Sequence, residues 1–190
     1  MEFEVSFTEL NNIIFCFDEG ECEPYEEDVA KTIIGKITTE GKKIGEIRLY
    51  RVYNDNKFYQ ICDDISEDMG ILAGLICDES GCISKNLLFE GADEFDSVFV
   101  LDNITIDEEY RGNGIGSAII ANLQKMLEYK FEFCRIIFLQ ASDFETGHKL
   151  GFDSKEYIEG NKRLMDFYKK AGFKTVKENV MIYLKPWAKI

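Results

Sequence analysis

The sequence contains few residues of the kinds that break up a fold or bind a metal. Its 190 residues include two prolines and one histidine, and no two of its six cysteines form a CxxC pair. A zinc site built from cysteine and histidine is therefore not expected. We interpret the cysteines as reduced, partly buried thiols. Because neither Pro24 nor Pro186 lies between two candidate cores, we expect a single domain over residues 1–190.

Long apolar runs and positive charge are also scarce. No segment approaches the ~20 apolar residues that a membrane span needs, and the N-terminal residues do not form a basic and then apolar leader. We therefore expect a cytoplasmic protein that does not act in a membrane. Lysine and arginine number 22 against 36 aspartates and glutamates, which gives a formal net charge of -14. This balance argues against nucleic-acid binding through phosphate neutralisation and is compatible with a cationic substrate.

Hydrophobic residues make up 45% of the chain, and their spacing predicts an α/β fold. Alternating or β-branched segments predict strands, with a hairpin at Glu40-Gly41, over residues 3–7, 13–17, 32–39, 43–53, 96–106, 135–140 and 176–184. Helical spacing predicts helices over residues 66–77, 115–129 and 161–171, the last ended by Gly172. The order of these elements indicates a mixed, largely antiparallel sheet flanked by helices. Residues 18–28 are expected to form an acidic loop, and residues 142–160 an insertion or an extra helix.

The segment YRGNGIGSAII, Tyr110–Ile120, places three glycines between a predicted strand and a predicted helix. Glycine costs a helix or strand about 0.5–1 kcal/mol relative to alanine, so three of them need a reason. The first N–H groups of a helix have no partner within it, and glycines leave them open to an anion. Arg111 adds a guanidinium group suited to phosphate. The segment predicts a diphosphate-binding loop; the alternative is a turn that only permits tight strand–helix packing.

The spacing of the loop excludes the two most familiar phosphate motifs. A P-loop would end in GK[ST], and the GxGxxG fingerprint fails because its third glycine position is Ser117 or Ile119. The pattern that fits is [Q/R]-x-x-G-x-[G/A], with Arg111, Gly114 and Gly116. In this the segment resembles the acetyl-CoA loop of the GNAT superfamily of N-acetyltransferases.

A second segment resembles the same superfamily. Asn161, Tyr168 and Gly172-Phe173 fall at the spacing N-x-x-x-x-x-[FLW]-Y-x-x-x-G-F. Both motifs lie within residues 96–184, whereas residues 1–95 share only a strand-rich character with the family. The resemblance implies a GNAT-like sheet and direct transfer of an acetyl group from acetyl-CoA to a primary amine of a small molecule or peptide, without a metal. The alternative is a non-catalytic acyl-CoA-binding module of the same fold.

The resemblance also implies roles for individual residues. The backbone of Ile104, Thr105 and Ile106 would pair with the pantetheine arm. The pyrophosphate would bind the loop formed by Arg111, Gly112, Asn113, Gly114, Ile115, Gly116 and Ser117. Tyr168 would protonate the departing thiol, or else serve only as a core aromatic. Asn161 would contact the cofactor, cap its helix, or do both.

The general base is the least defined role. Many members of the family carry a glutamate eleven residues before the loop arginine, where this chain has Val100. Asp102, expected on the same strand face, is the candidate to orient or deprotonate the amine, and the alternative is an ordinary strand-end aspartate. A further acidic cluster is interpreted as a loop and a helix N-terminus rather than a cation-accepting cleft; it comprises Asp63, Asp64, Glu67 and Asp68. Homodimers are frequent in the family, and the sequence decides neither this point nor the identity of the acceptor.

Overall fold

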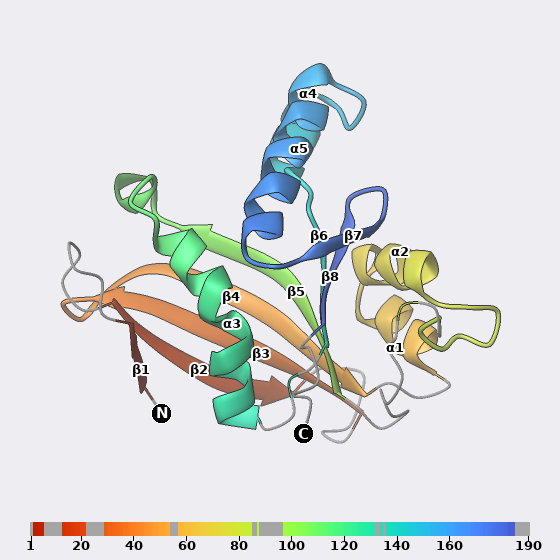
Figure 1. Cartoon of the computed structure of the whole chain (residues 1–190), viewed down its shortest axis with the longest axis horizontal. Helices are drawn as coiled ribbons and strands as arrows, with labels where there is room; N and C mark the ends of the chain where they lie inside the picture. The colour runs from red at the N-terminus through yellow and green to blue at the C-terminus, as the bar shows by residue number, and fades with distance from the viewer. Residues whose placement is uncertain are drawn as a thin grey trace.

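The computed structural model describes residues 2–5, 13–21, 29–53, 57–84, 87, 97–131, 134 and 136–184, which form a single eight-stranded sheet with helices (Figure 1). The strand order is β1-β2-β3-β4-β5-β6-β8-β7. The strands are β1 (Glu2–Val5), β2 (Ile13–Glu21), β3 (Ala30–Thr39), β4 (Lys42–Tyr53), β5 (Ser97–Ile106), β6 (Ile136–Gln140), β7 (Lys174–Lys177) and β8 (Val180–Leu184). Neighbouring strands are antiparallel except β5 and β6, which are parallel. The mixed, largely antiparallel sheet expected from the sequence is confirmed.

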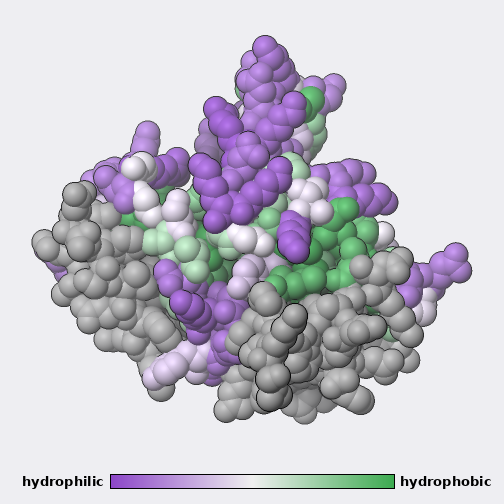
Figure 2. Space-filling view, in the orientation of Figure 1, coloured by the Kyte–Doolittle hydropathy of each residue, from purple (hydrophilic) through white to green (hydrophobic). Residues whose placement is uncertain are grey.

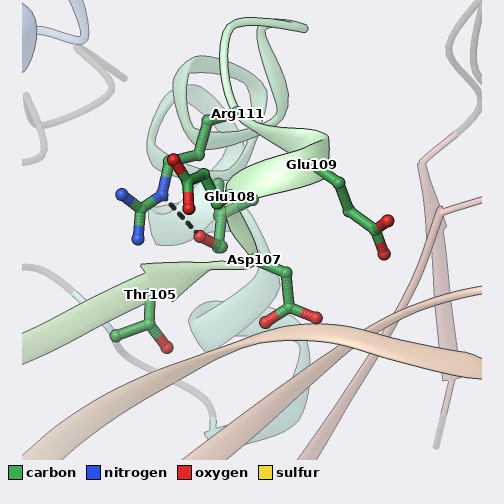
Figure 3. A pocket seen from close by; sticks show the side chains of 6 residues that line it. Thr105, Asp107, Glu108, Glu109 and Arg111 are labelled. Atoms are coloured by element: carbon green, nitrogen blue, oxygen red, sulfur yellow. Dashed lines mark hydrogen bonds between the residues drawn. The ribbon is translucent and has the colours of Figure 1, made fainter.

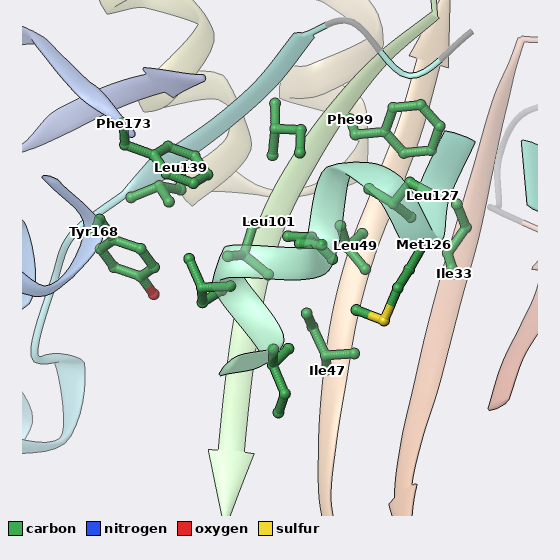
Figure 4. Close-up of a cluster of buried hydrophobic side chains, with 14 of the residues drawn as sticks. Ile33, Ile47, Leu49, Phe99, Leu101, Met126, Leu127, Leu139, Tyr168 and Phe173 are labelled. Carbon is green, nitrogen blue, oxygen red and sulfur yellow. The ribbon is translucent and has the colours of Figure 1, made fainter. Parts of the chain in front are cut away.

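Two hydrophobic clusters pack against the sheet. The helices are α1 (Phe58–Ile65), α2 (Glu67–Ile76), α3 (Ile115–Phe131), α4 (Phe144–Leu150) and α5 (Lys155–Lys170). One cluster joins α3 and Tyr168 of α5 to β3, β4, β5 and β6, as Figure 4 shows. The other joins α1 and α2 to side chains such as Val98 and Phe138. Since residues of β5 alternate between the two clusters, the helices cover both faces of the sheet.

The clearest sequence patterns predicted the central elements correctly. The β3–β4 hairpin turns at Glu40 and Gly41, whose φ values of 50° and 78° suit a two-residue turn. The predicted stripe of α3 is buried throughout, and it consists of Ile115, Ile119, Leu123 and Met126. Helix α2 begins behind Ser66, whose side chain accepts a hydrogen bond from the N–H of Met69.

Several boundaries differ from the sequence expectation. Helix α5 begins at Lys155 behind the cap Ser154, so Asn161 lies inside the helix and does not cap it. Its early turns are rich in charge and carry an exposed Lys155–Glu159 pair at 3.7 Å, so they lack the apolar stripe that marks a helix. Figure 2 shows the resulting hydrophilic surface over α4 and α5, in contrast to the hydrophobic residues beside α2.

Three further expectations were incomplete. The last predicted strand is a hairpin, β7–β8, because the chain turns at Glu178 with a φ of 51°. Helix α1 was missed, since it has only 8 residues and Lys57 at its start provides no side-chain cap. The predicted acidic loop is in strand β2 as far as Glu21, and the rest of it lies outside the described residues. Among the described helices, none combines the length and hydropathy that a bilayer crossing requires.

The packing of α3 predicts a large loss of stability on Ile119→Ala. Ile119 is 0% exposed, so the substitution should lower the free energy of unfolding by about 2–5 kcal/mol. The same change at Ile71 of α2, which is 50% exposed, should alter it by less than about 1 kcal/mol. Urea denaturation of the two variants measures both values, and equal losses would contradict the assignment of α3 to the core.

Candidate functional site

Strands β5 and β6 separate at one end of their shared ladder. Their pairing ends at Leu101 and Leu139, whereas β5 continues through Asp102 to Ile106. Within the described part of the chain, this last section of β5 pairs with β4 alone. Apart from the carbonyl oxygen of Ile106, which accepts a hydrogen bond from Arg111, its other backbone edge is therefore open to an extended ligand, in the manner of an added strand. The residues predicted to pair with a pantetheine arm, Ile104–Ile106, lie on this section.

A β-bulge marks the point where the strands separate. Leu101 pairs with Leu49, and Asn103 pairs with the adjacent Arg48, so Asp102 is the extra residue on β5. The bulge changes the side-chain alternation: Leu101 and Ile104 both pack toward the α3 cluster although they are three residues apart. Asp102 is therefore placed by a local irregularity of the strand.

A cavity of about 30 Å³ lies beside Asp102, which is room for roughly one water molecule. Its wall comes from four elements that meet where the strands separate. The lining residues are Asp68, Met69 and Leu72 of α2, Val100, Leu101 and Asp102 of β5, Gln140 of β6 and Phe144 of α4. Val100 and Asp102 therefore both border this cavity.

The carboxyl group of Asp102 is a better proton acceptor than an exposed aspartate. Burial raises the pKa of Asp102 above its usual value, and the negative charge of Asp68 raises it further. Arg48 opposes both effects from 3.9 Å, but the side chain of Asp102 is only 30% exposed and the raised pKa is the net result. A raised carboxyl pKa lies closer to neutral pH, which improves a general base.

The glycine loop has the open backbone that its pattern predicted. Gly112 and Gly114 have φ values of 81° and 76°, and a Cβ built at either residue would have no atom within 4 Å beyond the glycine and its two chain neighbours. The backbone N–H groups from Gly112 to Ser117 have no hydrogen-bond acceptor in the described ranges. Gly116 differs, because a Cβ there would make ordinary contacts at 3.5 and 3.6 Å, so alanine would fit. The loop therefore offers unpaired donors at the start of α3 to an anion.

Arg111 is fixed to the end of β5. Its Nε donates a 2.8 Å hydrogen bond to the carbonyl oxygen of Ile106 (Figure 3). A hollow of about 730 Å³ adjoins it, lined by Thr105, Ile106, Asp107, Glu108, Glu109 and Arg111. That volume would hold a cofactor-sized ligand, but its three carboxylates would repel phosphate. The amide side of the loop is the better diphosphate site.

Tyr168 presents a buried hydroxyl group. The residue is 7% exposed, and its ring packs against Phe167 and Phe173 with centroids 5.1 and 5.7 Å away. The hydroxyl has no hydrogen-bond partner among the residues that the structure describes, and Figure 4 shows it turned toward β5. Burial raises the pKa of Tyr168 to about 12, so the phenol keeps its proton at neutral pH. A core role accounts for the ring but not for an unpaired buried hydroxyl, which is costly without a partner.

Asn161 holds the start of α4 against α5. Its Oδ1 accepts a 2.7 Å hydrogen bond from the backbone N–H of Asp143. Asp143 in turn caps α4 by accepting from the N–H of Thr146 at 3.1 Å. Gly160 makes room for this contact, because a Cβ there would lie 2.6 Å from Oδ2 of Asp143. Residues 142–160 therefore form an extra helix and the first turns of α5, and they fix Phe144 beside the cavity. The predicted contact of Asn161 with a cofactor stays a prediction.

Part of this site was missed by reasoning from the sequence. Asp68 was interpreted as a helix N-terminal residue, yet it also lines the cavity, whereas Asp63, Asp64 and Glu67 do not. Gln140 and Phe144 were not singled out, since neither belongs to a motif. Their shared position, at or just after the end of a predicted strand, was the only signal in the sequence.

Comparisons with known proteins give a distant likeness. No protein-family model matches the chain, and no curated protein matches it in sequence. Among solved structures, the chain is similar to Arabidopsis thaliana NAA60 in complex with acetyl-CoA, at 15% identity and a TM-score of 0.45, covering 90% of this chain and 99% of that chain. It is also similar to AtaT complexed with acetyl-methionyl-tRNAfMet, at 13% identity and a TM-score of 0.42, covering 82% and 71% of the two chains. At these values the likeness assigns no function.

The contact between Gly160 and Asp143 predicts an unusual response to alanine. Alanine in place of glycine inside a helix normally stabilises by about 0.5–1 kcal/mol. Gly160→Ala should instead destabilise, because the added Cβ would displace Asp143. Gly74→Ala in α2 is the matched control, since its Cβ would meet only Tyr59 at 3.6 Å and should stabilise. Thermal unfolding of both variants tests the opposite signs; two stabilised variants would rule out the close contact.

Proposed function

We propose that this protein is an N-acetyltransferase that uses acetyl-CoA, as the GNAT resemblance implies. The observation that carries the proposal is the unpaired, buried hydroxyl of Tyr168. Phe167, the residue before it, approaches the start of α3, since a Cβ built at Gly116 would lie 3.6 Å from its ring. Tyr168 also shares one hydrophobic cluster with Ile115, Ile104 and Ile106, which supports a common site for the hydroxyl, the end of β5 and the glycine loop.

The residues present fit acetyl-CoA. The open edge of Ile104–Ile106 would hold the pantetheine amides, and the amides of Gly112–Ser117 would hold the pyrophosphate, with Arg111 beside them. Acetyl-CoA supplies an activated acyl group and a thiol as the leaving group. Tyr168 would donate its proton to the departing sulfur, because its phenol stays protonated at neutral pH.

Asp102 would act on the acceptor. An alkylamine has a pKa near 10.4 and is mostly protonated at neutral pH, so it must lose a proton before it attacks. Asp102 would accept that proton directly or through the single water for which the cavity has room. The proposed acceptor is a primary amine on a small molecule or peptide, and the acetyl group passes to it in a ternary complex.

The alternative is a module that binds an acyl-CoA without catalysis, which the lack of a carboxylate at Val100 would favour. The raised pKa and position of Asp102 favour the enzyme instead. The test incubates the purified protein with acetyl-CoA and a panel of amines and measures release of free thiol. Binding of acetyl-CoA with no thiol release from any amine would overturn the enzyme proposal.

Tyr168→Phe separates catalysis from folding. Loss of the proton donor should lower the turnover number about a hundredfold, while affinity for acetyl-CoA stays within about twofold. The melting temperature should not fall, because the hydroxyl has no hydrogen bond to lose. Tyr183→Phe, which changes a neighbouring ring that packs on Phe173, should retain full turnover. Equal turnover in both variants would remove Tyr168 from the acid role.

Comparison of Gly114→Ala with Gly41→Ala distinguishes an effect on ligand binding from the loss of stability caused by backbone strain. Its φ of 76° makes a side chain unfavourable by about 1–2 kcal/mol. Gly41→Ala carries the same strain at a φ of 78° in the β3–β4 turn, also in open space. Both variants should lose similar stability, but only Gly114→Ala should weaken acetyl-CoA binding, by about tenfold or more in calorimetry. Unchanged binding would count against the phosphate loop.

A further inference from the structure

A negatively charged turn leads from β5 into the glycine loop. Asp107, Glu108 and Glu109 follow the end of the strand and line the hollow beside Arg111. Consecutive Cα atoms are about 3.8 Å apart, so those of Glu109 and Arg111 are separated by at most about 7.6 Å. The Debye length at physiological ionic strength is about 8 Å. A carboxylate on this turn is therefore close enough to weaken the binding of a phosphate group beside Arg111.

Lys42, the first residue of β4, holds the last of these carboxylates. Its Nζ donates a 2.6 Å hydrogen bond to Oε1 of Glu109 and lies 5.2 Å from the centre of the Tyr110 ring. That ring is partly buried against the α3 cluster, which gives Lys42 a fixed surface to lie on. The hydrogen bond to Glu109 raises the pKa of Lys42, so its charge persists at neutral pH. Figure 3 shows the result, with the side chain of Glu109 extended away from Arg111.

The turn does not depend on Lys42 for its shape. The N–H of Asp107 donates a 2.9 Å hydrogen bond to the carbonyl oxygen of Ile44, and that of Tyr110 donates one of 2.9 Å to Asp107. The side chains of Lys42 and Glu109 are 58% and 62% exposed, and an ion pair as exposed as this adds little to stability. The consequence that remains is the direction in which the pair holds the carboxylate of Glu109.

We propose that Lys42 is a positioning residue for the acetyl donor, because it keeps the carboxylate of Glu109 away from the phosphate-binding side of the glycine loop. This inference rests on the proposed binding of acetyl-CoA by that loop. Lys42 does not contact the donor and acts only through Glu109. When Lys42 is removed, the side chain of Glu109 is free to turn toward Arg111, where its charge repels phosphate and competes for the guanidinium group.

The test titrates CoA calorimetrically into the full-length protein and its variants. Lys42→Met should weaken CoA binding about threefold at about 0.1 M salt, and by less than about 1.5-fold at about 1 M salt, where the Debye length falls to about 3 Å. Lys42→Arg should retain the affinity of the wild-type protein. So should Glu109→Gln, both alone and combined with Lys42→Met, because the repelling carboxylate is then absent.

Lys43→Met is the matched control. Lys43 lies on the same hairpin and has its own 2.6 Å ion pair, with Glu46, so its substitution removes the same charge without releasing Glu109. CoA affinity should be unchanged in this variant at both salt concentrations. A loss equal to that of Lys42→Met would overturn the inference, because the general charge of the hairpin would then be the cause.

The other outcomes separate this inference from the proposed function. An unchanged affinity in Lys42→Met overturns the role of Lys42, and so does a loss that persists when Glu109→Gln is added, since Lys42 would then act on the ligand directly. A loss in Glu109→Gln alone overturns it as well, because the ion pair would then be needed to shape the turn. A wild-type protein that binds no CoA overturns the phosphate loop and this inference together. CoA binding that follows the expected pattern, without thiol release from acetyl-CoA, overturns only the acetyltransferase proposal.

Discussion

The separation of β5 from β6 after Leu101 and Leu139 is the constraint on which the rest of the site depends. Parallel pairing up to that point holds the two strands together in the core. Beyond it, the bulge at Asp102 changes the direction of β5 side chains, and the free edge of the strand leads to the glycine loop. The sheet thus provides an opening at its centre, where a sheet would ordinarily be closed by its own hydrogen bonds.

Contacts between α5 and the chain that leaves β6 hold one side of this opening in position. Asn161 binds the backbone of Asp143, and Gly160 lets the two helices approach, so the chain leaving β6 is held against α5. Ser142 and Tyr157 add a 2.8 Å hydrogen bond between their hydroxyl groups in the same corner. Phe144 and Tyr168 therefore lie on two helices that are held against each other. These contacts fix the position of the cavity wall relative to the buried hydroxyl.

The sequence allowed prediction wherever the signal was local. The open backbone of the glycine loop, the stripe of α3 and the β3–β4 turn depend on residues that are neighbours in the chain, and these are as expected, whereas the binding role of the loop stays a prediction. The early turns of α5 were not predicted because charged residues on an exposed helix leave no apolar period. The bulge at Asp102 and the place of Asp68 depend on contacts between distant segments. The spacing of residues along a single sequence therefore does not predict either feature.

The two halves of the site come from different parts of the chain. The segments expected to hold the cofactor are the end of β5, the loop before α3, and α5, which carry the recognisable motifs. The walls near Asp68 and Phe144 come from α2 and from α4, which carry none. Under the proposed function, substitutions in those two helices would change which molecule is accepted and leave the segments expected to hold the cofactor intact. A lineage would then acquire new acceptors by drift in two short helices, without change to the residues proposed for the chemistry.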